Sequence, residues 1–122
     1  MSLFDVTQLG LERAIQGASV RQTALASNVA NANTPGYKPE DVDFHSALRA
    51  AFAQGPDQVS RSLESASFSP QADSSAAMQA DGNGVDIDVE NAGLAKNGLE
   101  YEGLVTVARA RLDILKSAMG VQ

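Results

Sequence analysis

The chain has 122 residues, with nine Lys and Arg against fifteen Asp and Glu, and a formal net charge of −6. This balance argues against a nucleic-acid-binding protein, and the absence of cysteine excludes disulfides, thiolate catalysis and Cys-ligated zinc. Because aromatic residues are few and Trp is absent, the composition predicts a small core that neighbouring chains complete.

Residues 3–33 are predicted to form one long helix, because apolar and small side chains recur at alternating steps of four and three. Such a heptad seam is typical of helices that pair with other helices. At 1.5 Å per residue the helix spans about 45 Å. Gly10 and Gly17 each weaken it by about 1 kcal/mol relative to Ala, so its stability depends on packing. The candidate packing residues of this seam are Leu11, Ile15, Ala18, Leu25 and Val29.

A stop signal follows at Asn33-Thr34-Pro35-Gly36-Tyr37. Pro35 has no backbone N–H and disfavours helical backbone at Thr34. Gly36 adopts a positive φ at low cost, so the Pro-Gly pair favours the centre of a type II turn. Asn33 tolerates the left-handed conformation that is common at helix ends.

Asn28 and Asn31 stand inside the helical pattern, where Asn is a poor helix former and competes for backbone hydrogen bonds. Alanines surround both residues, and small side chains allow close helix contact. Two interpretations follow from the residues alone. In the first, the run is only a helix stop. In the second, the amides fix the register of a helix end that packs against other chains, as a buried Asn does in coiled coils.

The middle of the chain, residues 35–86, is predicted to be a turn, a short helix and an extended loop. Within 39–54, a short helix is expected to carry Phe44, Leu48, Ala51 and Phe52 on one face. Residues 55–80 are rich in Ser, Gln, Gly and Pro and are predicted to be a loop, with a short strand near Leu63–Phe68. His45 is the only histidine, and we expect it to lie on the surface without a catalytic role.

The run from Asp81 to Asp88 resembles a calcium-binding loop but departs from its template. Val85 stands at a ligand position, Asp86 replaces the required Gly, and Ala92 replaces the bidentate Glu. The sequence instead predicts a Gly/Asn turn whose acidic residues begin a helix, where the helix dipole favours negative charge.

Residues 87–119 are predicted to form a second long helix with its own heptad seam, ended by Gly120. Apolar residues also occur on its other faces, so this helix is expected to meet more than one neighbour. The candidate packing residues of this seam are Leu94, Tyr101, Val105, Ala108, Leu112 and Leu115.

The sequence therefore predicts an all-α fold. An N-terminal core helix (1–34) and a C-terminal core helix (87–122) pair as an antiparallel coiled-coil hairpin and form one assembly domain, with an irregular, loop-rich segment (35–86) between them. The carboxylates are many, but no base, nucleophile or metal partner accompanies them, so neither an enzyme nor a cofactor or metal site is indicated.

Three stretches together resemble the flagellar basal-body rod proteins, and in particular the proximal rod subunits of the FlgB family. The first is Ala26-Ser27-Asn28-Val29-Ala30-Asn31-Ala32-Asn33-Thr34-Pro35-Gly36-Tyr37. The second is Asp41-Val42-Asp43-Phe44, and the third runs from Asp81 through Ala95-Lys96-Asn97-Gly98-Leu99-Glu100-Tyr101. The likeness covers about residues 8–45 and 81–120, and the middle of the chain carries none.

This resemblance implies a structural subunit that polymerises helically into the rod, the drive shaft between the membrane ring and the hook. It implies contacts with copies of itself, other proximal and distal rod proteins, the rod–ring adaptor, the membrane ring and the export gate, and neither nucleic acid nor a small-molecule substrate. It also implies a basal-body location in the periplasm-spanning rod after export without a cleaved signal peptide. The alternative from the residues alone is a non-flagellar coiled-coil assembly adaptor.

Overall fold

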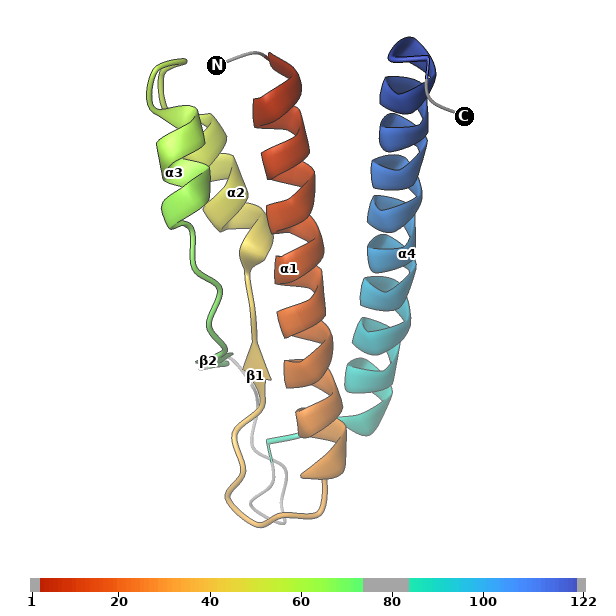
Figure 1. Ribbon diagram of the computed structural model, residues 1–122. Coiled ribbons are helices and arrows are strands. Elements are labelled where there is room, and N and C mark those ends of the chain that lie inside the picture. The colour runs from red at the N-terminus through yellow and green to blue at the C-terminus, as the bar shows by residue number, and fades with distance from the viewer. Residues whose placement is uncertain (1–2, 74–83, 121–122) are drawn as a thin grey trace.

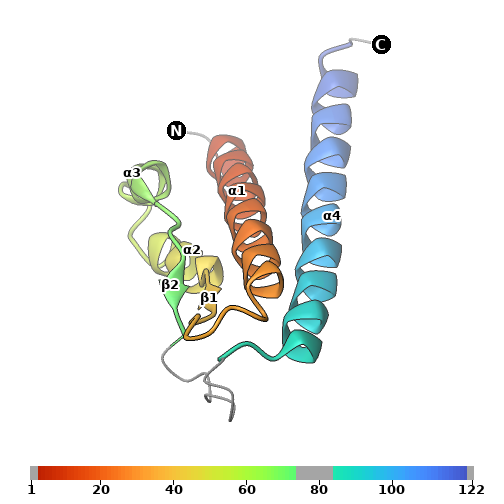
Figure 2. The same ribbon diagram turned by 90° about the horizontal axis from the view of Figure 1, so that it is seen from below.

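The computed structural model describes residues 3–73 and 84–120, and most of them are helical. The view from below shows three layers, with the first helix between the last helix and a layer of smaller elements (Figures 1 and 2). The elements are α1 (Leu3–Ala30), β1 (Glu40–Asp41), α2 (Phe44–Phe52), α3 (Val59–Ser65), β2 (Gln71–Ala72) and α4 (Ile87–Ala118).

The two long helices predicted from the sequence are present, and they run antiparallel (Figure 1). The start of α1 and the finish of α4 lie at one end of the molecule, which we call the open end. At the opposite end, the turn end, the chain leaves α1 through residues 31–39 and later enters α4. The smaller helices α2 and α3 lie toward the open end.

The stop after α1 is earlier than predicted, because the helix ends at Ala30 rather than at residue 33. The predicted type II turn is confirmed: Tyr37 N–H donates to the Thr34 carbonyl at 3.2 Å, and Gly36 has φ +76°. Asn33 does not adopt the left-handed conformation that it tolerates, since in the described ranges only glycines have positive φ. The Asn31 side chain instead donates to the Ser27 carbonyl at 2.9 Å.

The middle of the chain is more ordered than predicted. The expected loop contains α3, and the expected strand near Leu63–Phe68 is wrong, because Val59 and Leu63 bury one helical face against α2 and α1. A two-stranded antiparallel sheet also forms, with Glu40 opposite Ala72 and Asp41 opposite Gln71. The fold is therefore mostly helical with a small sheet, and its middle segment packs against α1.

Two glycines of α1 allow α2 to approach closely. A Cβ placed on Gly17 would lie 2.5 Å from the Phe44 Cβ, and one on Gly10 would lie 2.6 Å from the tip of the Phe52 ring. Phe44 is 1 % exposed and joins a buried cluster with Ala18, Ala24 and Val42. The glycines that weaken α1 as an isolated helix are thus the sites at which the core is built.

The beginning of α4 follows the prediction. The Asp86 carboxylate accepts hydrogen bonds from the backbone N–H groups of Asp88 and Val89, at 3.0 and 3.3 Å, and caps the helix. Gly120 follows the helix with φ +72°, as expected of a stop. The first residues of the calcium-like run, 81–83, lie outside the described residues. Among those described, no group of three or more acidic or histidine side chains is placed to hold a metal ion.

Asp43 caps α2 in the same way, since its carboxylate accepts from the Ser46 hydroxyl at 2.7 Å and from the Ser46 backbone N–H at 3.2 Å. These hydrogen bonds lower the pKa of Asp43, the hydroxyl contributing most. A lowered pKa in the folded state stabilises the protein above the carboxyl's unfolded pKa, and this gain disappears as the pH falls through the folded pKa.

We therefore expect Asp43→Ala to lower Tm at pH 7. The difference in Tm between the variant and the parent protein should become smaller as the pH falls below about 4. Thermal unfolding followed by circular dichroism between pH 2 and 7 measures both effects. Asp43→Asn is the matched control, because it keeps a capping oxygen without the charge and should change Tm less. A gap that stayed constant over this pH range would contradict the argument.

Candidate functional site

The side chain of Asn28 joins four parts of the chain near the turn end. Its Nδ2 donates to the Glu40 carbonyl at 2.7 Å and to the Glu90 carboxylate at 2.9 Å. Its Oδ1 accepts from the Glu40 N–H at 2.9 Å and from the Tyr37 hydroxyl at 3.2 Å. The amide is 1 % exposed and uses both donors and both acceptor positions. One residue thus connects α1, the turn, β1 and α4.

A second polar contact lies two helical turns further along α4. Asn97 is 1 % exposed, and its Nδ2 donates to the Ala18 carbonyl at 2.8 Å and to the Gln22 side chain at 2.7 Å. Glu90, seven residues earlier, is also buried. The α1–α4 interface is therefore polar toward the turn end. Leaving a buried polar group without its partner costs about 1–3 kcal/mol of stability. A shift of α4 along α1 would separate these pairs, so they disfavour any other register.

The predicted seam of α1 faces α4 over part of its length. Ala18 and Leu25 are buried, while Leu11, Ile15 and Val29 are half-buried. The opposite face of α1 packs on α2, α3 and β1. A helix in the middle layer is therefore covered on two faces, whereas the heptad pattern indicated one.

On α4 the contact with α1 is offset from the predicted seam. Its most buried residues are Glu90 and Asn97, and Leu94, Val105, Ala108 and Leu115 are half-buried. Two other seam residues, Tyr101 and Leu112, are exposed in the isolated chain. The hydrophobic pattern missed the offset because the central contact positions are polar.

The motif around the turn divides into buried and exposed parts. Asn28 lies inside, and Tyr37 is half-buried with its hydroxyl on Asn28. Asn31 shapes the helix end, where its Oδ1 accepts from the Thr34 hydroxyl at 3.1 Å. The remaining residues of the motif are exposed, namely Asn33, Thr34, Pro35 and Gly36.

Two side-chain contacts between distant segments were not foreseen from the sequence. The Arg21 guanidinium donates twice to the Asp41 carboxylate, at 2.8 and 3.1 Å, and ties α1 to β1. His45 lies on the surface as expected, but it pairs with Glu100 of α4 and its ring stacks on Phe44. Both partners are distant in sequence, so no local signal marked them.

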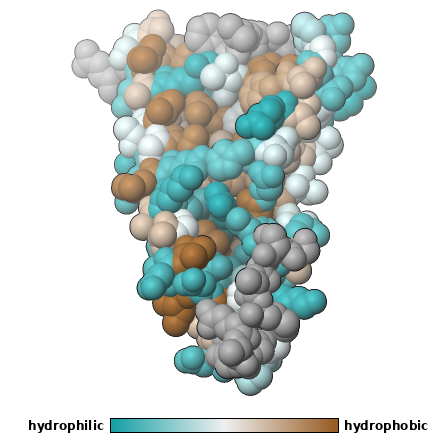
Figure 3. Space-filling view, turned by 180° about the vertical axis from the view of Figure 1, so that it is seen from behind, coloured by the Kyte–Doolittle hydropathy of each residue, from teal (hydrophilic) through white to brown (hydrophobic). Residues whose placement is uncertain are grey.

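At the open end, α1 and α4 diverge around an apolar groove of about 420 Å³, which we call the open-end groove. It is lined by Thr7, Leu11, Val107, Ala110, Arg111, Ile114 and Leu115. Apolar atoms also reach the surface in patches along the α4 side of the molecule (Figure 3). The most exposed large residues there are Leu99, Met119, Ile114 and Val89, each more than 60 % exposed. Such surfaces mark contacts with other chains.

Nothing in this arrangement resembles a catalytic centre within the described residues. The buried Asn28, Glu90 and Asn97 side chains make hydrogen bonds that join the two long helices, and the groove is apolar. No described helix is long and apolar enough to span a membrane. The features that remain for function are a pair of helices joined by buried hydrogen bonds and an exposed apolar surface.

Comparisons with known proteins agree with this arrangement. Residues 11–38 match the family model described as "Flagella basal body rod protein". The chain is 32% identical over 133 residues to the flagellar basal body rod protein FlgB of Bacillus subtilis, covering 98% of this chain and 97% of that protein. It is 36% identical to FlgB of Salmonella typhimurium, covering 83% of each, and 32% identical to FlgB of Cereibacter sphaeroides, covering 92% and 93%.

The matched family segment contains Asn28 and the turn, and the full-length matches extend through α4. Rod proteins of this kind are structural subunits, not enzymes, which agrees with a site built from helix-joining hydrogen bonds. The chain therefore belongs to the FlgB family of flagellar basal body rod proteins.

Proposed function

We propose that this chain is a proximal-rod subunit that polymerises helically between the membrane ring and the hook. The observation that carries the proposal is the exposed apolar surface of α4 in a member of a structural rod family. The isolated chain leaves large apolar side chains in water, and packing against neighbouring subunits would remove them from it.

In this proposal α1 and α4 form an antiparallel coiled-coil hairpin that acts as one assembly domain, spanning residues 1–34 and 87–122. The Asn28–Glu90 and Asn97–Gln22 contacts hold its register, and residues 35–86 form the turn and the outer layer. The exposed seam residues Tyr101 and Leu112 then contact other subunits. Torque passes through many small packed interfaces rather than through chemistry.

The partners proposed are copies of the chain, other proximal and distal rod proteins, the rod–ring adaptor, the membrane ring and the export gate. The proposed location is the periplasm-spanning rod of the basal body, reached without a cleaved signal peptide. The family likeness supports the location, and the exposed apolar surface supports the need for partners.

A clean deletion of the gene in its host tests this function. We expect loss of swimming, and isolated basal bodies should show rings without rod or hook in electron micrographs. A plasmid copy of the unchanged gene should restore both, which controls for effects on neighbouring genes. Normal hooks and normal swimming after deletion would instead favour a non-flagellar coiled-coil adaptor.

A further inference from the structure

The two halves of α4 are held differently. Among the residues of α4, all of which the structure describes, only Glu90 and Asn97 are buried, and both belong to its first half. Glu90 accepts a hydrogen bond from Asn28, and Asn97 donates to the Ala18 carbonyl and to the Gln22 side chain. Buried hydrogen bonds therefore anchor the first half of α4 to α1.

The last contacts that anchor α4 lie near the middle of the helix. His45 of α2 pairs with Glu100, and Leu104 packs against the buried cluster around Phe44. Beyond Leu104 the residues of α4 are half-buried or exposed, and the open-end groove separates them from the start of α1. We call this part of α4, residues 105–118, the arm.

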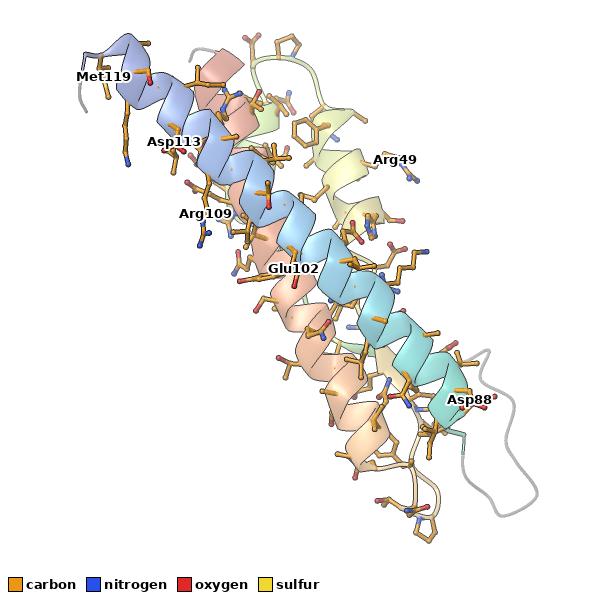
Figure 4. The ribbon with its side chains drawn as sticks, turned by 90° about the vertical axis from the view of Figure 1, so that its right-hand side faces the viewer. Arg49, Asp88, Glu102, Arg109, Asp113 and Met119 are labelled. Atoms are coloured by element: carbon orange, nitrogen blue, oxygen red, sulfur yellow. The ribbon has the colours of Figure 1, made fainter. Side chains whose placement is uncertain are left out.

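Two glycines stand where the anchoring contacts end. Gly98 and Gly103 belong to the middle of α4, which Glu102 marks in Figure 4, between the start of the helix at Asp88 and the arm at Asp113. A Cβ on either glycine would meet nothing within 4 Å, so no close contact in this structure requires them. Each glycine weakens the helix about fivefold relative to Ala. The helix is therefore weakened at the boundary between its anchored half and the arm.

We propose that Gly98 and Gly103 form a hinge, about which the arm swings between the open position of the structure and a closed position against the start of α1. Closure removes the open-end groove of about 420 Å³, because side chains of α1 and α4 themselves fill it. Val107 and Ile114, which are 54% and 69% exposed, then pack toward Leu11 and lose contact with water. The inference concerns the single chain and does not depend on the proposed polymerisation.

The charged side chain in the lining of the groove, that of Arg111, is compatible with closure. Arg111 is half-buried already in the open position. A long arginine side chain packs its methylene groups on apolar surface while its guanidinium stays in water. Closure therefore does not require the burial of a charge.

A movement of the whole helix would not close the groove without breaking the anchoring contacts. Glu90 and Asn97 would lose their hydrogen-bond partners on α1, and buried polar groups without partners are costly. Bending between Gly98 and Gly103 leaves both contacts in place, and glycine accepts altered backbone angles more readily than other residues do. The anchoring contacts and the glycines together therefore favour a bend over a shift.

Cysteine cross-linking of the purified chain measures closure, because the chain has no cysteine of its own. Counting along the antiparallel helices from the contacts of Asn97, Ala110 stands at about the level of Thr7. Thr7→Cys/Ala110→Cys therefore places two thiols across the groove, which both residues line. On oxidation at low protein concentration we expect an intramolecular disulfide, seen as a faster band in non-reducing electrophoresis.

Stiffening the hinge should slow this reaction. Gly98→Ala and Gly103→Ala each favour the straight helix, so we expect each to slow disulfide formation about fivefold, and both together by more than about tenfold. Gly93→Ala is the matched control, because it adds the same helix propensity in the anchored half and its Cβ meets Leu25 at an ordinary distance of 3.5 Å. Its rate should equal that of the double-cysteine chain without further changes.

Three results would overturn the hinge. If the double-cysteine chain forms no intramolecular disulfide, the arm does not reach α1. If the rates are equal with and without the two glycines, the thiols meet without bending at these positions. If Gly93→Ala slows the reaction as much as Gly103→Ala does, general helix stability accounts for the effect. Each of these outcomes leaves the proposed function unchanged, since the deletion strain tests it separately.

Discussion

Replacing Asn28 with Ala is expected to lower the free energy of unfolding by about 3–5 kcal/mol, the range for breaking a buried polar network with a charged member. The substitution removes four hydrogen bonds at once and leaves the buried Glu90 carboxylate and both backbone groups of Glu40 without this partner. Domains of this size are stable by about 5–15 kcal/mol, so the loss is a large share of the total.

Urea unfolding of the purified chain measures this change, and swimming of the complemented deletion strain measures its consequence. Asn33→Ala is the matched control, because this asparagine belongs to the same motif but is exposed, and its replacement should cost less than about 0.5 kcal/mol. Equal losses for the two variants would refute the role assigned to Asn28.

A pair of compensating substitutions tests directly whether Asn28 and Glu90 interact. Asn28→Asp removes both donors and sets a second carboxylate against Glu90, so we expect it to be at least as harmful as Asn28→Ala. Adding Glu90→Gln supplies an amide donor at the other side of the contact and removes the repulsion. The double variant should therefore recover part of the stability, and a purely additive result would argue against direct coupling.

Gly17→Ala is expected to destabilise the protein by about 2 kcal/mol, although Ala is the better helix former. The new methyl group would lie 2.5 Å from the Phe44 Cβ, which is fixed to the backbone of α2 and cannot rotate away. Overpacking of this kind costs about 1–3 kcal/mol and sometimes more, and the gain in helix propensity, about 1 kcal/mol, offsets only part of it.

A Gly→Ala substitution on α4 should change the stability in the opposite direction. A Cβ on Gly103 meets nothing within 4 Å, so Gly103→Ala is expected to stabilise the isolated chain by about 1 kcal/mol through helix propensity alone. Gly10→Ala should be less harmful than Gly17→Ala, because it meets the movable tip of the exposed Phe52 ring. Thermal unfolding of the three variants gives this order, and a stabilising Gly17→Ala would contradict the packing argument.

The candidate site was only partly accessible from the sequence. Asn28 stood out because Asn is a poor helix former, and Glu90 carried no comparable signal among many acidic residues. The link between them spans 62 positions and exists only because α4 returns alongside α1. Asn97 was hidden for a similar reason, since an exposed polar side chain and a buried, paired one look the same in a sequence.

The features that the sequence alone determined are local ones: the two long helices, the Pro-Gly turn at Gly36, the cap at Asp86 and the stop at Gly120. Their physical causes act within a few residues, through backbone geometry and helix period. Only the tertiary structure decided that α3 and the small sheet form, that Gly17 is a point of close approach, and which flank of α4 stays exposed. These depend on contacts between segments far apart in the chain, where burial and paired hydrogen bonds outweigh the local preferences of each segment.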